Sequence, residues 1–85
     1  MSRAKQVERP IIALTGATGF VGQAVLDAAL DAGYAVRALT RRAQPERKGV
    51  DWVGGDLADG AALAELTRGV EAVVHVAGVV NAPDV

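Results

Sequence analysis

The sequence has almost none of the residues that build metal and thiol sites. Its 85 residues include no cysteine and a single histidine, His75. The absence of cysteine excludes disulfide frameworks, thiolate metal ligands and cysteine nucleophiles. A single histidine excludes the usual sites in which several imidazoles hold one metal ion. We therefore expect no metal site.

An excess of charge of one sign is also missing. Nine Lys and Arg side chains stand against ten Asp and Glu side chains, which gives a formal net charge of −1. Binding to nucleic acid through counterion release requires a clustered positive excess. We therefore expect no nucleic-acid partner.

Long apolar runs are absent as well. The first apolar segment follows a charged N-terminal stretch and is interrupted by Gly16, Gly19 and Gly22. This pattern is typical of neither a signal peptide nor a membrane span. We expect a cytoplasmic protein without a membrane partner.

What the sequence does contain is an alternation of strand and helix patterns. The apolar run 10–15, bounded by proline and glycine, is typical of a strand covered on both faces of a parallel sheet. The patterns follow in the order strand, helix, strand, strand, helix, strand, which is typical of a parallel α/β sheet with right-handed crossovers. The predicted elements are strands at 10–15, 34–40, 50–53 and 71–77 and helices at 20–32 and 60–68.

Local signals predict where the helices end and which sides are buried. Gly33 and Gly69 follow the two helices, where a left-handed C-terminal cap favours glycine, and Asp59 precedes the second helix as an N-cap. Helical periodicity predicts the sheet-facing positions. These are Val21, Ala24, Val25, Ala28 and Ala29 in the first helix and Leu63 and Leu66 in the second.

The segment between the first strand and the first helix carries three glycines at intervals of three. We expect Gly16 to make the tight exit from the strand, Gly19 to let the backbone approach a pyrophosphate, and Gly22 to let the helix pack closely on the sheet. The first-turn amides of the helix would then face the phosphates. An ordinary turn is the alternative, but this position favours phosphate binding. The residues expected around the phosphates are Gly16, Thr18, Gly19, Phe20, Val21 and Gly22.

The string Thr-Gly-Ala-Thr-Gly-Phe-Val-Gly at 15–22 resembles the fingerprint of the extended short-chain dehydrogenase/reductases, which include the NAD-dependent epimerase/dehydratase family. The resemblance covers residues 11–82 and implies a Rossmann-type doubly wound parallel sheet. It also implies that Asp56 and the backbone of Leu57 meet the adenine, and that the strand ending at Ala77 and Gly78 passes beneath the adenosine. Plain turn chemistry is the alternative for Asp56.

The end of the second predicted strand bears on the choice of cofactor. An NAD site has an acidic residue there, whereas this strand ends in Leu39-Thr40-Arg41-Arg42. A guanidinium can grip a 2′-phosphate through two parallel hydrogen bonds. We therefore expect NADP, with Arg41 or Arg42 as the ligand of its 2′-phosphate. Arg47 and Lys48 in the following loop would add to the positive electrostatic field. The alternative is NAD, with these basic residues as solvated surface charges.

No catalytic residue is assigned. The family that the sequence resembles uses a Tyr-x-x-x-Lys pair, but Tyr34 is the one tyrosine and Ala38 stands four residues after it. We interpret His75 as a buried, hydrogen-bonded histidine near the cofactor, with a catalytic base as the alternative. Trp52 is interpreted as a packing residue.

These observations predict an incomplete Rossmann-type domain of four strands and two helices. We expect residues 1–9 to be frayed and 10–85 to form the N-terminal part of a truncated NAD(P)-binding domain. The expected sheet order is third, second, first and fourth strand, which leaves the edge of strand 71–77 open to self-association. Three functions stay open: a segment of an oxidoreductase, epimerase or dehydratase acting by hydride transfer, a non-catalytic dinucleotide sensor or assembly module, and a non-functional truncation product.

Overall fold

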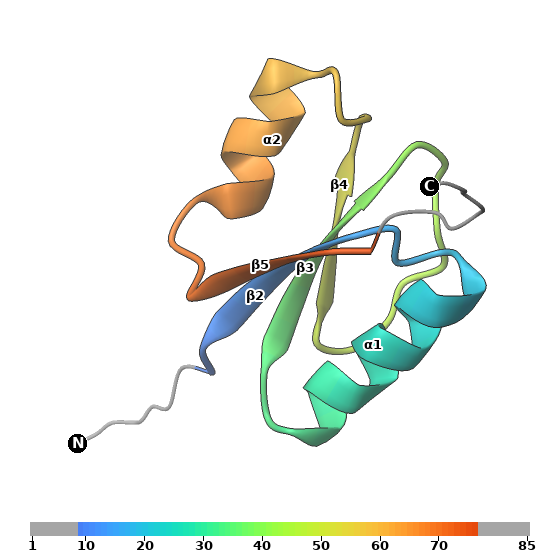
Figure 1. Cartoon of the computed structure of the whole chain (residues 1–85), viewed down its shortest axis with the longest axis vertical. Helices are drawn as coiled ribbons and strands as arrows, with labels where there is room; N and C mark the ends of the chain where they lie inside the picture. The colour runs from blue at the N-terminus through green and yellow to red at the C-terminus, as the bar shows by residue number, and fades with distance from the viewer. Residues whose placement is uncertain (1–8, 77–85) are drawn as a thin grey trace, which may run out of the picture.

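Four parallel strands form the sheet, and one helix lies on each of its faces (Figure 1). This computed structural model describes residues 9–76. The strand order is β4-β3-β2-β5, which confirms the predicted α/β class and sheet order. The elements are β2 (Ile11–Thr15), α1 (Phe20–Asp31), β3 (Ala35–Thr40), β4 (Val50–Gly54), α2 (Gly60–Thr67) and β5 (Ala72–His75).

The alternation of side chains along the central strands divides the core into two layers. Ile12 and Leu14 of β2 pack with α1 on one face, whereas Ala13 packs with α2 on the other. Because both faces of β2 are covered, its sequence is apolar from Ile11 to Leu14, as a strand covered on both faces requires. The helices therefore hold the sheet from both sides and leave the ends of the strands accessible.

The buried face of α1 differs from the predicted one. Gly22, Leu26 and Ala29 are buried, while Val21 and Ala24 are exposed, as is Ala28. Gly22 fixes the rotation of the helix, because a Cβ at this position would collide with the backbone of Gly16 and Ala17. The predicted face is one residue out of phase because this contact with the preceding loop sets the rotation of the helix; of the predicted positions, Ala29 is buried and Val25 is partly buried.

Both helices end as their local signals predicted. Gly33 has a φ of 98° and Gly69 a φ of 70°, the left-handed conformation that glycine adopts without strain. The side chain of Asp59 accepts a hydrogen bond of 3.1 Å from the amide of Ala62 and so caps α2. Leu66 is buried and Leu63 partly buried beneath the helix, as expected.

The second helix is also held by a residue that the sequence analysis did not single out. Arg37 of β3 is only 8% exposed. Its Nη1 donates to the main-chain oxygens of Glu65, Leu66 and Arg68 at 3.0, 3.4 and 2.6 Å, and its Nε lies 3.5 Å from Asp51. A buried guanidinium thus satisfies the free carbonyls at the C-terminal end of α2.

Candidate functional site

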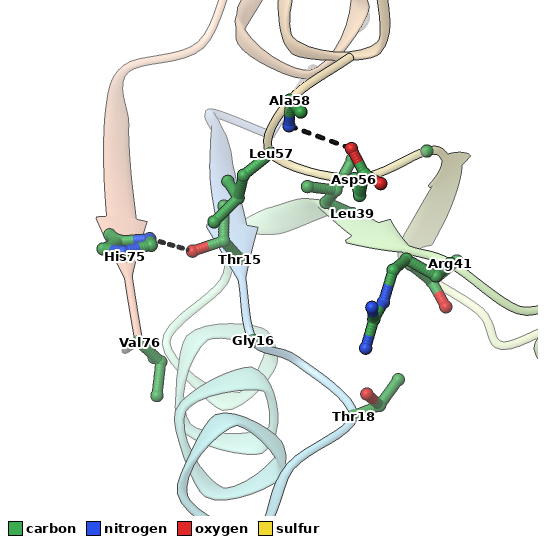
Figure 2. Close-up of a pocket in the computed structure, with 12 residues that line it drawn as sticks. Thr15, Gly16, Thr18, Leu39, Arg41, Asp56, Leu57, Ala58, His75 and Val76 are labelled. Atoms are coloured by element: carbon green, nitrogen blue, oxygen red, sulfur yellow. Dashed lines mark hydrogen bonds between the residues drawn. The ribbon is translucent and has the colours of Figure 1, made fainter. Parts of the chain in front are cut away.

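A pocket of about 580 Å³ opens at the carboxyl ends of the four strands (Figure 2). Ligands bind at this edge in doubly wound sheets because the loops that follow the strands converge there. The volume falls within the roughly 300–1,000 Å³ that is usual for small-molecule sites. The lining residues are Thr15, Gly16, Thr18, Leu39, Thr40, Arg41, Gly55, Asp56, Leu57, Ala58, His75 and Val76.

Two glycines of the loop between β2 and α1, Gly16 and Gly19, and Gly22 in the first turn of α1 are glycine for different structural reasons. Gly16 has a φ of 77°, and a Cβ there would also collide with the main-chain oxygen of Val76. Gly22 is required because a Cβ at this position would collide with the backbone of Gly16 and Ala17, so its close contact is with the loop, although α1 as a whole packs on the sheet. Gly19 has a φ of −80°, and its nearest would-be contact is the oxygen of Gly16 at 3.6 Å. Within residues 9–76, packing therefore gives no reason for glycine at this position.

The N-terminus of α1 has no cap of its own. Gly19 supplies no side-chain hydrogen bond, and no acidic residue lies in the first turn. The other helix, by contrast, is capped by Asp59. The first-turn amides carry a partial positive charge and need acceptors. The loop and helix thus present backbone donors, without a competing carboxylate, beside the pocket.

Arg41 brings a positive charge into the pocket. Its side chain extends from the end of β3 toward Thr18 at the apex of the glycine loop (Figure 2). The hydroxyl of Thr40 donates to the oxygen of Arg42 at 2.7 Å and accepts from its amide at 3.2 Å, which fixes the turn that carries both arginines. Arg42 is exposed and does not line the pocket.

The other two basic residues expected to contribute to the site lie apart from it. Arg47 donates to Asp27 of α1 at 2.6 Å, so its charge is paired on the surface. Lys48 is exposed, and neither residue lines the pocket. The structure therefore gives Arg47 a carboxylate partner on the neighbouring helix.

The loop between β4 and α2 forms another wall of the pocket. Asp56 accepts a hydrogen bond of 2.9 Å from the amide of Ala58, so one of its carboxylate oxygens takes part in a turn (Figure 2). Leu57 lines the pocket and is 53% exposed. Gly55 has a φ of 148°, and a Cβ there would collide with Ala62. The loop therefore places an apolar and an acidic side chain together at the pocket wall.

His75 and Thr15 join the ends of β5 and β2. The hydroxyl of Thr15 is hydrogen-bonded to Nδ1 of His75, which confirms the expected hydrogen-bonded histidine. The expected burial is wrong, because β5 lies at the edge of the described sheet and the imidazole is exposed. Beyond the pair, the amide of Val76 donates to the oxygen of Thr15 at 3.2 Å.

The predicted site residues are only partly brought together in the pocket. Gly16, Thr18, Arg41, Asp56 and Leu57 line it, whereas Gly19, Phe20, Val21, Gly22 and Arg42 do not. Phe20 is 95% exposed and Val21 56% exposed at the start of α1. Ala77 and Gly78 lie outside the described residues.

Several lining residues were not predicted as ligands. Thr15, Leu39 and Thr40 end their strands at the pocket, and Gly55 and Ala58 belong to the loop after β4. Their signal in the sequence was their place at the carboxyl ends of strands, where side chains of different strands meet. In residues 9–76, no cluster of three metal-ligating side chains was found. No helix of the described part is long and apolar enough to cross a membrane.

Comparisons with known proteins agree on one family. The sequence profile of the NAD dependent epimerase/dehydratase family matches residues 12–85. A ceramide reductase of Caulobacter vibrioides is 40% identical over 78 residues, which cover 87% of this chain and 25% of that protein. A (4-alkanoyl-5-oxo-2,5-dihydrofuran-3-yl)methyl phosphate reductase of Streptomyces griseus is 46% identical over 79 residues, covering 87% of this chain and 27% of that protein. The chain thus spans about a quarter of the length of these relatives.

Solved structures agree with the sequence relatives. A short-chain dehydrogenase/reductase superfamily protein of Agrobacterium tumefaciens with bound NAD is 39% identical and has a TM-score of 0.68, with coverage of 86% of this chain and 22% of that one. The enzyme WbmH of Bordetella bronchiseptica, in complex with NAD⁺, is 25% identical with a TM-score of 0.69, over 91% of this chain and 29% of that one. Both resemble this chain in its Rossmann-type arrangement.

Proposed function

The chain belongs to the NAD dependent epimerase/dehydratase family, and on that premise we propose that it holds the adenine-side half of NADP, with the pyrophosphate on the loop between β2 and α1. Residues 10–85 would then form the N-terminal part of an NAD(P)-binding domain. The expected cytoplasmic location belongs to the same proposal.

The loop geometry carries the phosphate assignment. Packing requires glycine at positions 16 and 22, but within the described residues it does not require glycine at position 19. A ligand that touches the backbone would supply the missing reason, because any side chain would stand between it and the amides. The uncapped first turn of α1 fits an anion in the same place. Together, these features fit a diphosphate held by main-chain N–H groups, with Thr18 beside it.

Two other walls fit the remainder of the cofactor. Leu57 offers an apolar surface and Asp56 an acceptor, which suit an adenine ring and its amino group. Arg41 extends into the pocket where a 2′-phosphate would be recognised, and no carboxylate stands at the end of β3 to bind a 2′-hydroxyl. The two solved relatives described above contain NAD, so the choice of NADP depends on Arg41.

The reaction of the whole protein follows from the cofactor and the relatives. Bound NADP supplies hydride chemistry, while this segment binds and orients it. Because the two named sequence relatives are reductases, we propose a reduction by hydride transfer as the activity. The sequence contains no Tyr-x-x-x-Lys pair, so the acid–base groups would lie in a further part of the domain. A sensor that binds the dinucleotide without catalysing a reaction is the alternative function.

Arg41→Ala tests the proposed cofactor preference. Loss of a charge-assisted contact to the 2′-phosphate should weaken NADP binding by about tenfold or more. Affinity for NAD should change little, because NAD has no group for the guanidinium to grip. Isothermal titration calorimetry with both cofactors measures the two dissociation constants.

Arg42→Ala is the matched control. It removes the same charge from the neighbouring position, which lies outside the pocket. It should leave both affinities nearly unchanged. Equal losses for NADP and NAD in Arg41→Ala, or a larger NADP loss in Arg42→Ala, would contradict the assignment of Arg41.

A further inference from the structure

The hydrogen bond between Thr15 and His75 joins two strands at the point where the glycine loop begins. The two residues are register partners in the parallel pair of β2 and β5, 60 positions apart in the sequence. Both line the pocket (Figure 2). Gly16 follows Thr15 directly, so the hydroxyl anchors the residue from which the loop departs.

The structure shows why this point of β5 needs an anchor. Within residues 9–76, β5 is an edge strand of four residues that pairs with β2 alone. The next residue, Val76, lies so close to Gly16 that its main-chain oxygen would collide with a Cβ there. A shift at the end of β5 would therefore act directly on the backbone of Gly16. The path of the glycine loop depends on where β5 ends.

The direction of the hydrogen bond follows from burial. Thr15 is 5% exposed, and in the described part of the chain its hydroxyl has no other hydrogen-bond partner. A buried hydroxyl that only accepted would leave its proton unpaired, at a cost in free energy. A bond in which the hydroxyl donates to Nδ1 pairs this proton, and it requires the ring proton of His75 to be on Nε2.

We propose that Thr15 and His75 are positioning residues, whose hydrogen bond fixes the end of β5 against Gly16 and so holds the glycine loop in the shape that accepts a diphosphate. This inference rests on the proposed function. It gives His75 a role through the loop, without proton transfer to a substrate. Loss of the bond should affect the diphosphate and leave the adenine side unaltered.

Paired substitutions test this role in the full chain. Thr15→Val and His75→Gln remove the hydroxyl and the Nδ1 acceptor, whereas Thr15→Ser and His75→Asn keep a hydroxyl and an acceptor at the same place. The first two should weaken NADP binding by about three- to tenfold, the size of one hydrogen bond, and the second two should bind nearly as the parent does. The double variant Thr15→Val/His75→Gln should lose no more than either single variant, because both break the same bond.

Adenosine 2′-monophosphate is the second probe, because it carries the adenine and the 2′-phosphate but no diphosphate. Its affinity should be the same in all variants, as measured by NMR titration. Equal losses for NADP and for this probe would overturn the proposal, since they would indicate a general structural defect. Unchanged NADP affinity in Thr15→Val and His75→Gln would also overturn it.

The ¹⁵N chemical shifts of the His75 imidazole can be measured in the unsubstituted chain. This measurement requires neither a folded variant nor a bound ligand. A proton on Nε2, with Nδ1 as acceptor, supports the proposed bond, and a proton on Nδ1 overturns it. If the parent chain binds neither NADP nor NAD, the proposed function fails, while these shifts still decide whether the hydrogen bond exists as described.

Discussion

At the scale of single residues, the three loop glycines show what a sequence can and cannot predict. Their spacing between a strand and a helix predicted a tight, close-packed turn, and Gly16 and Gly22 have the steric reasons expected of such a turn. The contact predicted for Gly22 was wrong, because this residue lies against the backbone of Gly16 and Ala17 in the loop and was expected to lie against the sheet. Gly19 differs from both, because no packing contact within the described residues requires glycine at this position.

Arg37 is the residue whose role the sequence concealed. It stands in a strand pattern between Val36 and Ala38, where an arginine suggests solvent, yet it is buried. Its partners are main-chain oxygens near Glu65 and Arg68, some thirty positions later, and carbonyls carry no signal in a sequence. Contacts of this kind become visible only when the strand and the helix are placed together.

At the scale of elements, the sequence predicted types, order and ends well. All six predicted elements are present in the described chain with bounds that differ by at most two residues. The orientation of α1 was the main error, because rotation about a helix axis depends on a contact outside the helix. The site was predicted only in part: the predicted sheet order already brought the ends of β2 and β3 together, but Thr15 and Thr40 were not predicted to line the pocket.

The attachment of α2 to β3 gives a prediction at this scale. Arg37→Met should lower the free energy of unfolding by about 2–3 kcal/mol, because it removes charge-assisted hydrogen bonds to three carbonyls, of which that to Leu66 is buried. Urea denaturation followed by circular dichroism measures this loss. The substitution removes the contact that joins the C-terminal end of α2 to β3.

Arg68→Met is the control for that experiment. Arg68, the residue after the last one of α2, forms an ion pair of 2.7 Å with Glu65 of that helix, and both side chains are at least half exposed. Exposed pairs contribute about 0.2–1 kcal/mol, so this change should cost little. If Arg37→Met and Arg68→Met were equally destabilising, Arg37 would not have the role described.

At the scale of the whole molecule, the open edge of β5 decides how the chain behaves in solution. Val73 is 53% exposed on this strand, which in residues 9–76 pairs only with β2. Exposed strand edges pair readily with other chains. We expect the 85-residue chain to self-associate, with a sedimentation coefficient that rises with concentration.

Val73→Lys should shift this equilibrium toward the monomer, because a charged side chain disfavours pairing at an edge. Phe20→Lys is the control, since it removes an apolar side chain that is 95% exposed but lies at the start of α1. Analytical ultracentrifugation compares the three chains. Equal dispersal by both substitutions would show that general apolar contact, and not the strand edge, drives association.

The central claim is that main-chain amides at the start of α1 hold a dinucleotide diphosphate, and Gly19→Asp tests it most directly. The carboxylate can cap α1, so the free energy of unfolding should stay level or rise by a few tenths of a kcal/mol. The same carboxylate would occupy and repel the diphosphate position, so affinity for NADP and NAD should fall by about a hundredfold or more.

Gly60→Asp introduces the same charge at the first residue of α2, where a Cβ meets nothing within 4 Å. Stability should again stay level or rise slightly, but affinity for the dinucleotide should not change. Calorimetric titration of the parent and the two variants is the decisive measurement. The account predicts a folded Gly19→Asp chain that has lost its dinucleotide affinity. A folded Gly19→Asp chain that binds the dinucleotide as tightly as the parent would contradict it.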